Sequence, residues 1–78
     1  MSQPPITLEN LLDLVRRQLG VRDVSVELEL RADLGAESID IQNLVSAMEE
    51  RYGVVFEDDE LERLVTVGDL FELVRSKA

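Results

Sequence analysis

Three stretches of this 78-residue chain carry apolar side chains at the spacing of a helix that buries one face. Apolar residues three and four positions apart fall on the same side of an α-helix, so each stretch predicts an amphipathic helix. The stripes are Leu8, Leu11, Leu12, Val15 and Leu19; Ile41, Leu44, Val45, Met48 and Tyr52; and Val67, Leu70, Phe71 and Val74. Because short helices are marginal alone in water, the three must pack against one another.

The ends of these helices are also marked in the sequence. Thr7, Ser38 and Thr66 precede the apolar stripes and are predicted to cap the helix starts, since serine and threonine oxygens accept free amide hydrogens there. Gly20 and Gly53 follow the first two stripes and are predicted to end those helices, because glycine adopts the left-handed conformation easily.

The remaining segments connect the helices. The acidic residues 57–63 predict a short helix with Leu61 and Leu64 turned inward. Residues 24–31 alternate apolar and polar side chains as a strand does, but their only β-prone partner is the run 54–56, and a two-stranded ribbon is marginal. We therefore expect residues 21–36 to form a long, mostly extended loop. The expected fold is all-α: a small four-helix bundle of three main helices and one short helix.

The length of the chain allows one domain, which we expect at residues 6–78 after a disordered lead-in of residues 1–5. The absence of cysteine and of a recognisable signal peptide fits the cytoplasm. No apolar run is long enough to span a bilayer, so we expect no membrane insertion. A monomer is the expected state.

Charge narrows the possible partners. Residues 37–62 hold nine acidic residues and one basic residue, which accounts for most of the net charge of −9. Such a surface repels phosphates, so nucleic acid is not an expected partner. The acids form either a solvated surface that keeps the protein soluble or an electrostatic docking face for basic partners. Composition alone favours the first interpretation.

Catalysis by this chain alone is not expected. The sequence contains no histidine and no cysteine, so it lacks a Ser–His pair, a thiol nucleophile and the usual ligands of zinc. The acidic run at residues 57–60 lacks the spacing of a calcium loop, and we expect no metal site. The four glycines are scattered and form no phosphate-binding loop.

The run DLGAESIDIQNLVSAMEERYGV, residues 33–54, resembles the acyl carrier protein family, whose attachment motif reads D-L-G-x-D-S-L-D or close to it. The residues that match the motif are Asp33, Leu34, Gly35, Ser38 and Asp40; Glu37 replaces an aspartate and Ile39 a leucine. The order of helices and the acidity also agree, so the resemblance extends over residues 6–76.

The resemblance implies a carrier and not a catalyst. Ser38 would be esterified with 4′-phosphopantetheine from coenzyme A by a separate phosphopantetheinyl transferase that uses magnesium. The arm ends in a thiol, which would carry acyl groups as thioesters to partner enzymes such as acyltransferases and ketosynthases. The modifying enzyme would activate the hydroxyl, so this chain would need no base of its own.

The resemblance also assigns roles to neighbouring residues. Asp33, Leu34, Gly35 and Glu37 would shape the attachment site, with Gly35 allowing a tight turn and a close approach. The residues expected to contact partner enzymes are Glu37, Ile39, Asp40, Glu49 and Glu50. The bundle could shelter an acyl chain among residues such as Leu44, Val45, Met48 and Leu64.

Four residues depart from the pattern usual in fatty acid synthesis: Gln42, Asn43, Ser46 and Arg51. The pathway therefore stays open between fatty acid, polyketide and related biosynthesis. The alternative function is an unmodified acidic helical module that binds a basic protein, in which Ser38 would be a helix cap and nothing more.

Overall fold

The computed structural model describes residues 6–77, and these residues form four helices and no strand. The helices are α1 (Leu8–Leu19), α2 (Ser38–Tyr52), α3 (Asp58–Glu62) and α4 (Val67–Lys77). The expected all-α bundle of three main helices and one short helix is therefore confirmed. The predicted disordered lead-in, residues 1–5, lies outside the described residues.

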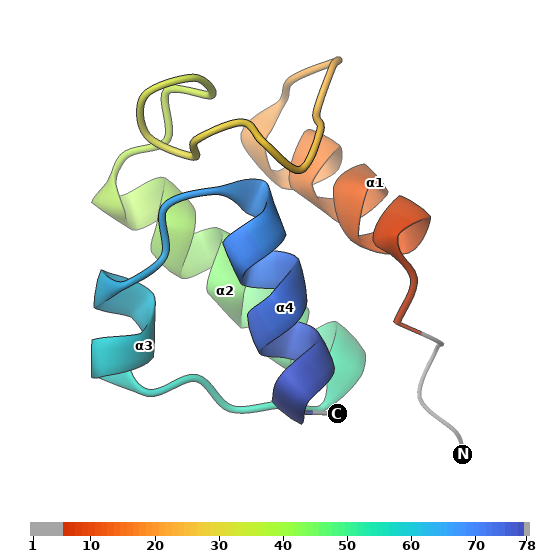
Figure 1. The fold of residues 1–78 in the computed structure, drawn as a ribbon, viewed down its shortest axis with the longest axis vertical. Coiled ribbons are helices and arrows are strands. Elements are labelled where there is room, and N and C mark those ends of the chain that lie inside the picture. The colour runs from red at the N-terminus through yellow and green to blue at the C-terminus, as the bar shows by residue number, and fades with distance from the viewer. Residues whose placement is uncertain (1–5, 78) are drawn as a thin grey trace.

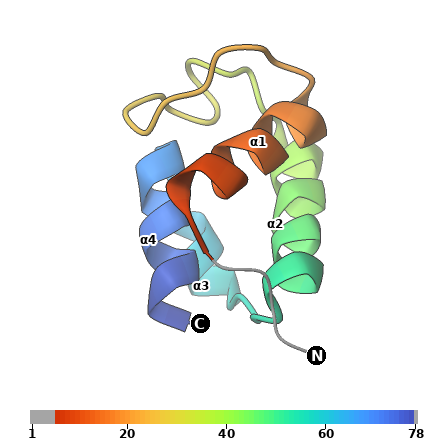
Figure 2. The ribbon, with the colours of Figure 1, turned by 90° about the vertical axis from the view of Figure 1, so that its right-hand side faces the viewer.

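The three main helices surround one core. α1 packs against both α2 and α4 and crosses them obliquely (Figures 1 and 2). α2 and α4 begin at the same end of the bundle, and the loop that follows α1 passes over this end (Figures 1 and 2). The helix that bears Ser38 therefore starts directly beneath the loop.

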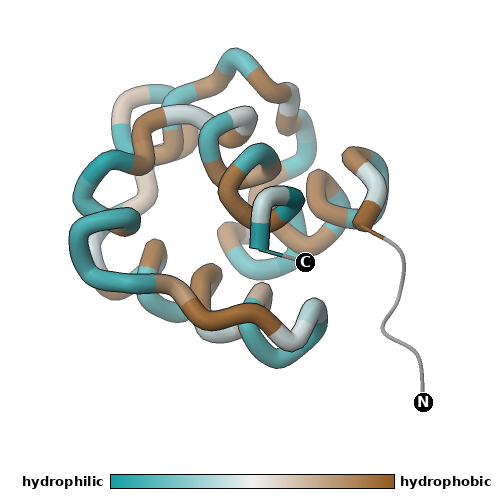
Figure 3. The backbone as a smooth tube through the Cα atoms, turned by 60° about the horizontal axis from the view of Figure 1, so that its bottom comes forward, coloured by the Kyte–Doolittle hydropathy of each residue, from teal (hydrophilic) through white to brown (hydrophobic). Residues whose placement is uncertain are grey.

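The apolar stripes face the core as predicted, most completely on α2. All five α2 stripe residues are buried, and Leu44 and Met48 have no exposed surface. On α1 only Leu11 and Val15 are fully buried, while the other stripe residues are partly buried. Apolar and polar segments alternate along the helices (Figure 3), which is the pattern of a bundle with one buried interior.

Most predicted helix ends are confirmed. The Thr7 side chain accepts a hydrogen bond from the Asn10 amide at 3.1 Å, and Thr66 Oγ1 accepts one from the Asp69 amide at 3.0 Å. Gly20 and Gly53 end α1 and α2 with φ angles of 67° and 68°. The amide of each glycine bonds to a carbonyl of the preceding helix, which closes the last turn.

The prediction that residues 21–36 form a mostly extended loop is wrong for its second half, which folds into turns. The turns are held by local hydrogen bonds, since the Glu29 carbonyl accepts the amides of Asp33 and Leu34, and the loop is anchored to α4. The carbonyls of Val26 and Leu28 accept the amides of Gly68 and Val67 at 2.9 and 3.0 Å, so the loop backbone satisfies the first donors of α4. One isolated bridge, between Glu29 and Thr66, is the only trace of β pairing in the described part of the chain.

Candidate functional site

Ser38 is the first residue of α2, and its side chain is exposed. The prediction that Ser38 caps this helix is wrong, because the N-cap is Glu37. Glu37 and Asp40 form a capping box, in which the Glu37 amide donates to Asp40 Oδ2 at 2.9 Å. The hydroxyl of Ser38 is thus at the helix start without serving as its cap.

The loop before Ser38 is held by Glu29 and Asp33. Asp33 Oδ2 accepts the Glu29 amide at 2.8 Å, while the Glu29 carbonyl accepts the amides of Asp33 and Leu34 at 3.0 and 3.1 Å. The next turn closes where the Ala36 amide donates to the Leu30 carbonyl at 2.9 Å. These bonds fix the path of the backbone into α2.

Gly35 has a φ of 70°, a conformation that other residues adopt only with strain. A Cβ atom at this position would meet nothing within 4 Å. The expected tight turn is therefore present, but the expected close approach is not. The conformation, and not a lack of space, is what favours glycine here.

Arg31 lies beside Ser38, which the sequence pattern did not reveal. Its Nη2 lies 3.5 Å from Ser38 Oγ, at the outer limit of a hydrogen bond. The available signal was a single base seven positions before the serine, in a segment dominated by acids. The contact itself depends on the turns of the loop, which were not predicted.

A hollow of about 290 Å³ opens beside Ser38, between the start of α2 and the short helix α3. It is lined by Arg31, Ser38, Ile41, Gln42, Asp58, Leu61 and Glu62. Arg31 is the one basic residue in this lining, which also contains two carboxylates. The hydroxyl therefore stands at the edge of a partly apolar, partly acidic depression.

The residues expected to contact partners fall in two places. Glu37, Ile39 and Asp40 flank Ser38 at the start of α2, and Ile39 is 58% exposed. Glu49 and Glu50 lie roughly 16 Å further along the helix axis. Glu50 is exposed, whereas Glu49 is half-buried and accepts the Phe56 amide at 2.9 Å. Glu49 therefore also holds the connection between α2 and α3.

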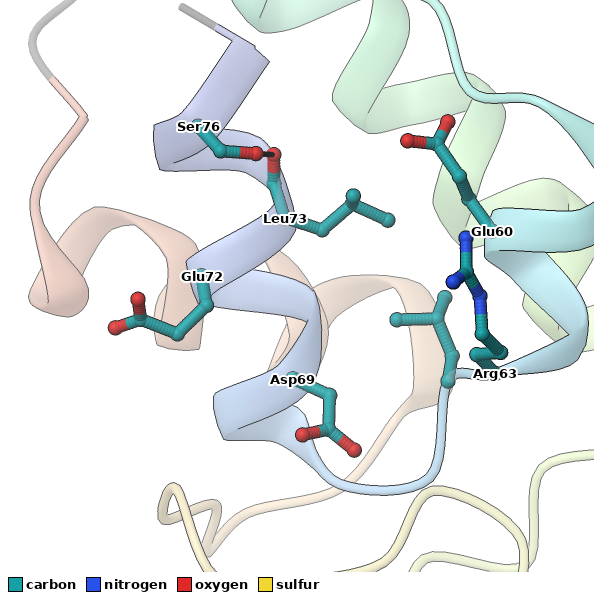
Figure 4. Close-up of a pocket in the computed structure, with 7 residues that line it drawn as sticks. Glu60, Arg63, Asp69, Glu72, Leu73 and Ser76 are labelled. Atoms are coloured by element: carbon teal, nitrogen blue, oxygen red, sulfur yellow. Dashed lines mark hydrogen bonds between the residues drawn. The ribbon is translucent and has the colours of Figure 1, made fainter.

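A larger hollow, of about 470 Å³, lies between α3 and α4 (Figure 4). It is lined by Glu60, Arg63, Leu64, Asp69, Glu72, Leu73 and Ser76. A hydrogen bond from Lys77 holds the pKa of Glu60 below its ordinary value. Of the residues expected to shelter an acyl chain, only Leu64 lines this hollow, while Leu44, Val45 and Met48 belong to the core.

Residues 6–77 lack both a recognisable metal-binding group and a membrane-spanning helix. They contain no group of three or more histidine, cysteine, aspartate or glutamate side chains that could hold a metal ion. None of the helices in this range is long and apolar enough to cross a membrane.

Sequence comparison finds relatives over most of the chain. A family model described as "Phosphopantetheine attachment site" matches residues 9–74. An acyl carrier protein of Helicobacter pylori is 37% identical over 68 residues, covering 85% of this chain and 87% of the relative. An acyl carrier protein of Nitratidesulfovibrio vulgaris is 37% identical over 71 residues, covering 88% and 93%.

Solved structures of acyl carrier proteins have the same fold as this chain. The holo acyl carrier protein of Geobacter metallireducens superposes with a TM-score of 0.80 at 28% identity, covering 94% of this chain and 86% of that one. The acyl carrier protein of Thermotoga maritima gives a TM-score of 0.77 at 26% identity, covering 90% and 84%. Together with the motif around Ser38, these matches establish that the chain belongs to the acyl carrier protein family, whose cofactor is covalently attached phosphopantetheine.

Proposed function

We propose that Ser38 is the residue that receives 4′-phosphopantetheine from coenzyme A, and that the protein carries acyl groups on this arm to partner enzymes. The arm supplies a thiol, on which acyl groups are held as thioesters. The observation that supports Ser38 most strongly is its position as the first residue of α2 with an exposed hydroxyl. Since Glu37 and Asp40 form the capping box, substitution on this oxygen breaks no helix cap.

The surroundings of Ser38 fit a phosphate diester. The start of a helix presents free amide groups and the positive end of the helix dipole, both of which favour an anion. Asp33, Leu34 and Gly35 shape the loop that leads to this start, and Glu37 caps it. The Ser38 hydroxyl has Arg31 as its side-chain partner, and a guanidinium group cannot act as a general base. This fits activation by a separate phosphopantetheinyl transferase.

The partner face in this proposal consists of Glu37, Ile39, Asp40, Glu49 and Glu50. Basic residues around the active sites of acyltransferases, ketosynthases and other acyl-processing or acyl-loading enzymes would meet these acids, with Ile39 as the apolar contact. Charge complementarity of this kind mainly accelerates encounter and selects partners, and salt weakens it. The two acids far from Ser38 would orient α2 while the first turn presents the arm.

The proposed setting is one carrier domain, residues 6–78, acting as a monomer in the cytoplasm without catalytic residues of its own. The pathway is fatty acid, polyketide or a related biosynthesis. Gln42 and Asn43, near the attachment site, depart from the fatty acid pattern and are the residues where partner choice would differ.

The test is modification in vitro. Incubation with coenzyme A, magnesium and a broad-specificity phosphopantetheinyl transferase should raise the intact mass of the wild type by one phosphopantetheine group. Ser38→Ala should keep its original mass under the same conditions. A wild-type protein that stays unmodified would favour the alternative, an acidic helical module that binds a basic protein through charge alone.

A further inference from the structure

We propose that Arg31 holds the phosphate diester at the root of the arm and so fixes the direction in which the arm leaves the protein. This inference rests on the proposed attachment at Ser38. It concerns a side chain outside the recognised motif, contributed by the loop before α2. Arg31 would be a positioning residue, since it takes no part in the chemistry at the thiol.

The first support is geometric. Arg31 Nη2 already lies 3.5 Å from Ser38 Oγ, and a hydroxyl at that distance is a weak partner for a guanidinium group. The phosphate oxygens of the attached group would lie two bonds beyond Oγ. Arginine presents a planar fork of donors that matches phosphate oxygens, so a small adjustment would replace one weak contact with charge-assisted hydrogen bonds.

The second support is that Arg31 has no acidic ion-pair partner in the part of the chain that the structure describes. Among residues 6–77, four of the eight basic side chains form ion pairs: Arg17–Asp13 at 3.0 Å, Arg63–Asp59 at 3.3 Å, Arg75–Glu72 at 3.7 Å and Lys77–Glu60 at 2.8 Å. Within the same range Arg31, like Arg16, Arg22 and Arg51, forms no such ion pair, although the segment that follows Arg31 is strongly acidic. Its charge is therefore available for an anion that arrives later.

The third support is electrostatic. The hollow beside Ser38 is lined by Asp58 and Glu62 as well as Arg31, and Glu37 and Asp40 lie at the start of α2. A phosphate diester adds another negative charge to this acidic environment. Arg31 is the only cation in the lining that can compensate it. Without Arg31, repulsion would push the arm away from the hollow and into solvent.

Phosphorus NMR of the modified protein tests the inference, because the arm contains a single phosphorus atom. Holo wild type, Arg31→Gln and Arg22→Gln are compared, each first verified by intact mass. Arg22 is an exposed base of the same loop with the same charge. The same proteins unfolded in urea give the resonance of an unconstrained diester. We expect the phosphorus resonance of Arg31→Gln to lie most of the way toward its position in the unfolded protein. The resonance of Arg22→Gln should stay at the wild-type position.

Thermal unfolding gives a second readout that does not depend on activity. Modification should raise the melting temperature of the wild type and of Arg22→Gln, and Arg31→Gln should lose this increase. Arg31→Lys keeps the charge without the planar fork, so it should recover part of both effects. Circular dichroism of the unmodified protein shows whether Arg31→Gln folds. If Arg31→Gln folds poorly, Arg31→Lys replaces it as the test variant. High salt should weaken both effects in the wild type.

The outcomes separate the two proposals. A wild type that gains no mass removes the attachment proposal before Arg31 is tested. Another outcome is that all variants gain the mass of phosphopantetheine while the wild type and Arg31→Gln show the same phosphorus resonance and the same rise in melting temperature. In that case attachment at Ser38 stands and the role of Arg31 is refuted. The positioning role is equally refuted if Arg31→Gln only slows modification, since Arg31 would then act in the encounter with coenzyme A or the transferase.

Discussion

The amide of Glu37 donates a hydrogen bond to the carboxylate of Asp40 at 2.9 Å, and this capping box spans Ser38 without using its hydroxyl. Two residues that the family motif suggests as partner contacts thus have a structural role as well. Their pairing lets the serine stand at a helix start while its oxygen remains available for substitution.

Because of this capping box, substitutions at Asp40 and Ser38 should lower the stability of the fold by different amounts. Asp40→Ala removes one side of the capping box and should destabilise the unmodified protein by about 0.5–2 kcal/mol. Ser38→Ala removes a hydroxyl that caps nothing and should change stability by less than about 0.5 kcal/mol. Urea unfolding monitored by circular dichroism measures both. A larger loss for Ser38→Ala than for Asp40→Ala would mean that the serine is the real cap.

The core of α2 supplies a stability prediction. Leu44 has no exposed surface and belongs to the cluster of buried side chains at the centre of the bundle. Leu44→Ala should therefore cost about 2–5 kcal/mol, from the lost apolar contact and the cavity left behind. Asn43→Ala, an exposed neighbour, is the matched control and should have little effect. A loss of well under about 2 kcal/mol at Leu44 would contradict the assignment of this helix face.

Stability at low pH should depend on Asp69. Hydrogen bonds from the Thr66 and Val65 amides hold the pKa of Asp69 below its ordinary value of 3.8. A lowered pKa in the folded protein means that the ionised carboxylate stabilises the fold above about pH 3.8. This contribution is lost as the pH falls through the folded pKa. As the pH falls below 3.8, stability should therefore depend less steeply on pH for Asp69→Asn than for the wild type, and equal slopes would disprove this role.

The two distal acids of α2 should respond differently to charge reversal. Glu50→Lys changes an exposed charge, so it should slow association with the transferase while circular dichroism and stability stay unchanged. Asp23→Lys, an exposed acid in the loop after α1, is the control and should associate at the wild-type rate. The difference should shrink in high salt. Equal association rates for the two variants would remove Glu50 from the partner face.

Glu49→Lys should lower stability as well as association. Its carboxylate accepts the Phe56 amide at 2.9 Å in a partly buried position, and a lysine cannot accept that bond. Urea unfolding should show a loss of about 1–3 kcal/mol. If Glu49→Lys is as stable as Glu50→Lys, the hydrogen bond to Phe56 does not stabilise the connection between α2 and α3.

The sequence predicted the helices well because their determinants are local. The α2 stripe from Ile41 to Tyr52 is buried in full, and Gly53 ends the helix through a left-handed conformation that glycine favours. The choice of N-cap was less predictable. Glutamate is not among the preferred capping residues, so the sequence alone favours the serine as the cap. The deciding factor was the reciprocal pairing of Glu37 with Asp40.

The loop and the site depended on contacts that a linear pattern does not contain. Val26 and Leu28 bond to the first amides of α4, which lie far along the chain, and this pairing anchors a stretch whose alternation is typical of a strand. The turns that follow, closed by bonds to the Glu29 carbonyl, bring Arg31 to Ser38. The motif indicates Ser38 as the candidate attachment residue, whereas the contact with Arg31 is visible only from the path of the loop.

The proposed carrier function requires that Ser38 bears the phosphopantetheine arm in the living cell. Intact-protein and peptide mass spectrometry of material purified from its own host tests this requirement. We expect a population whose mass is increased by one phosphopantetheine, with the added group on the peptide that contains Ser38. A Ser38 side chain that is unmodified under every growth condition would contradict it.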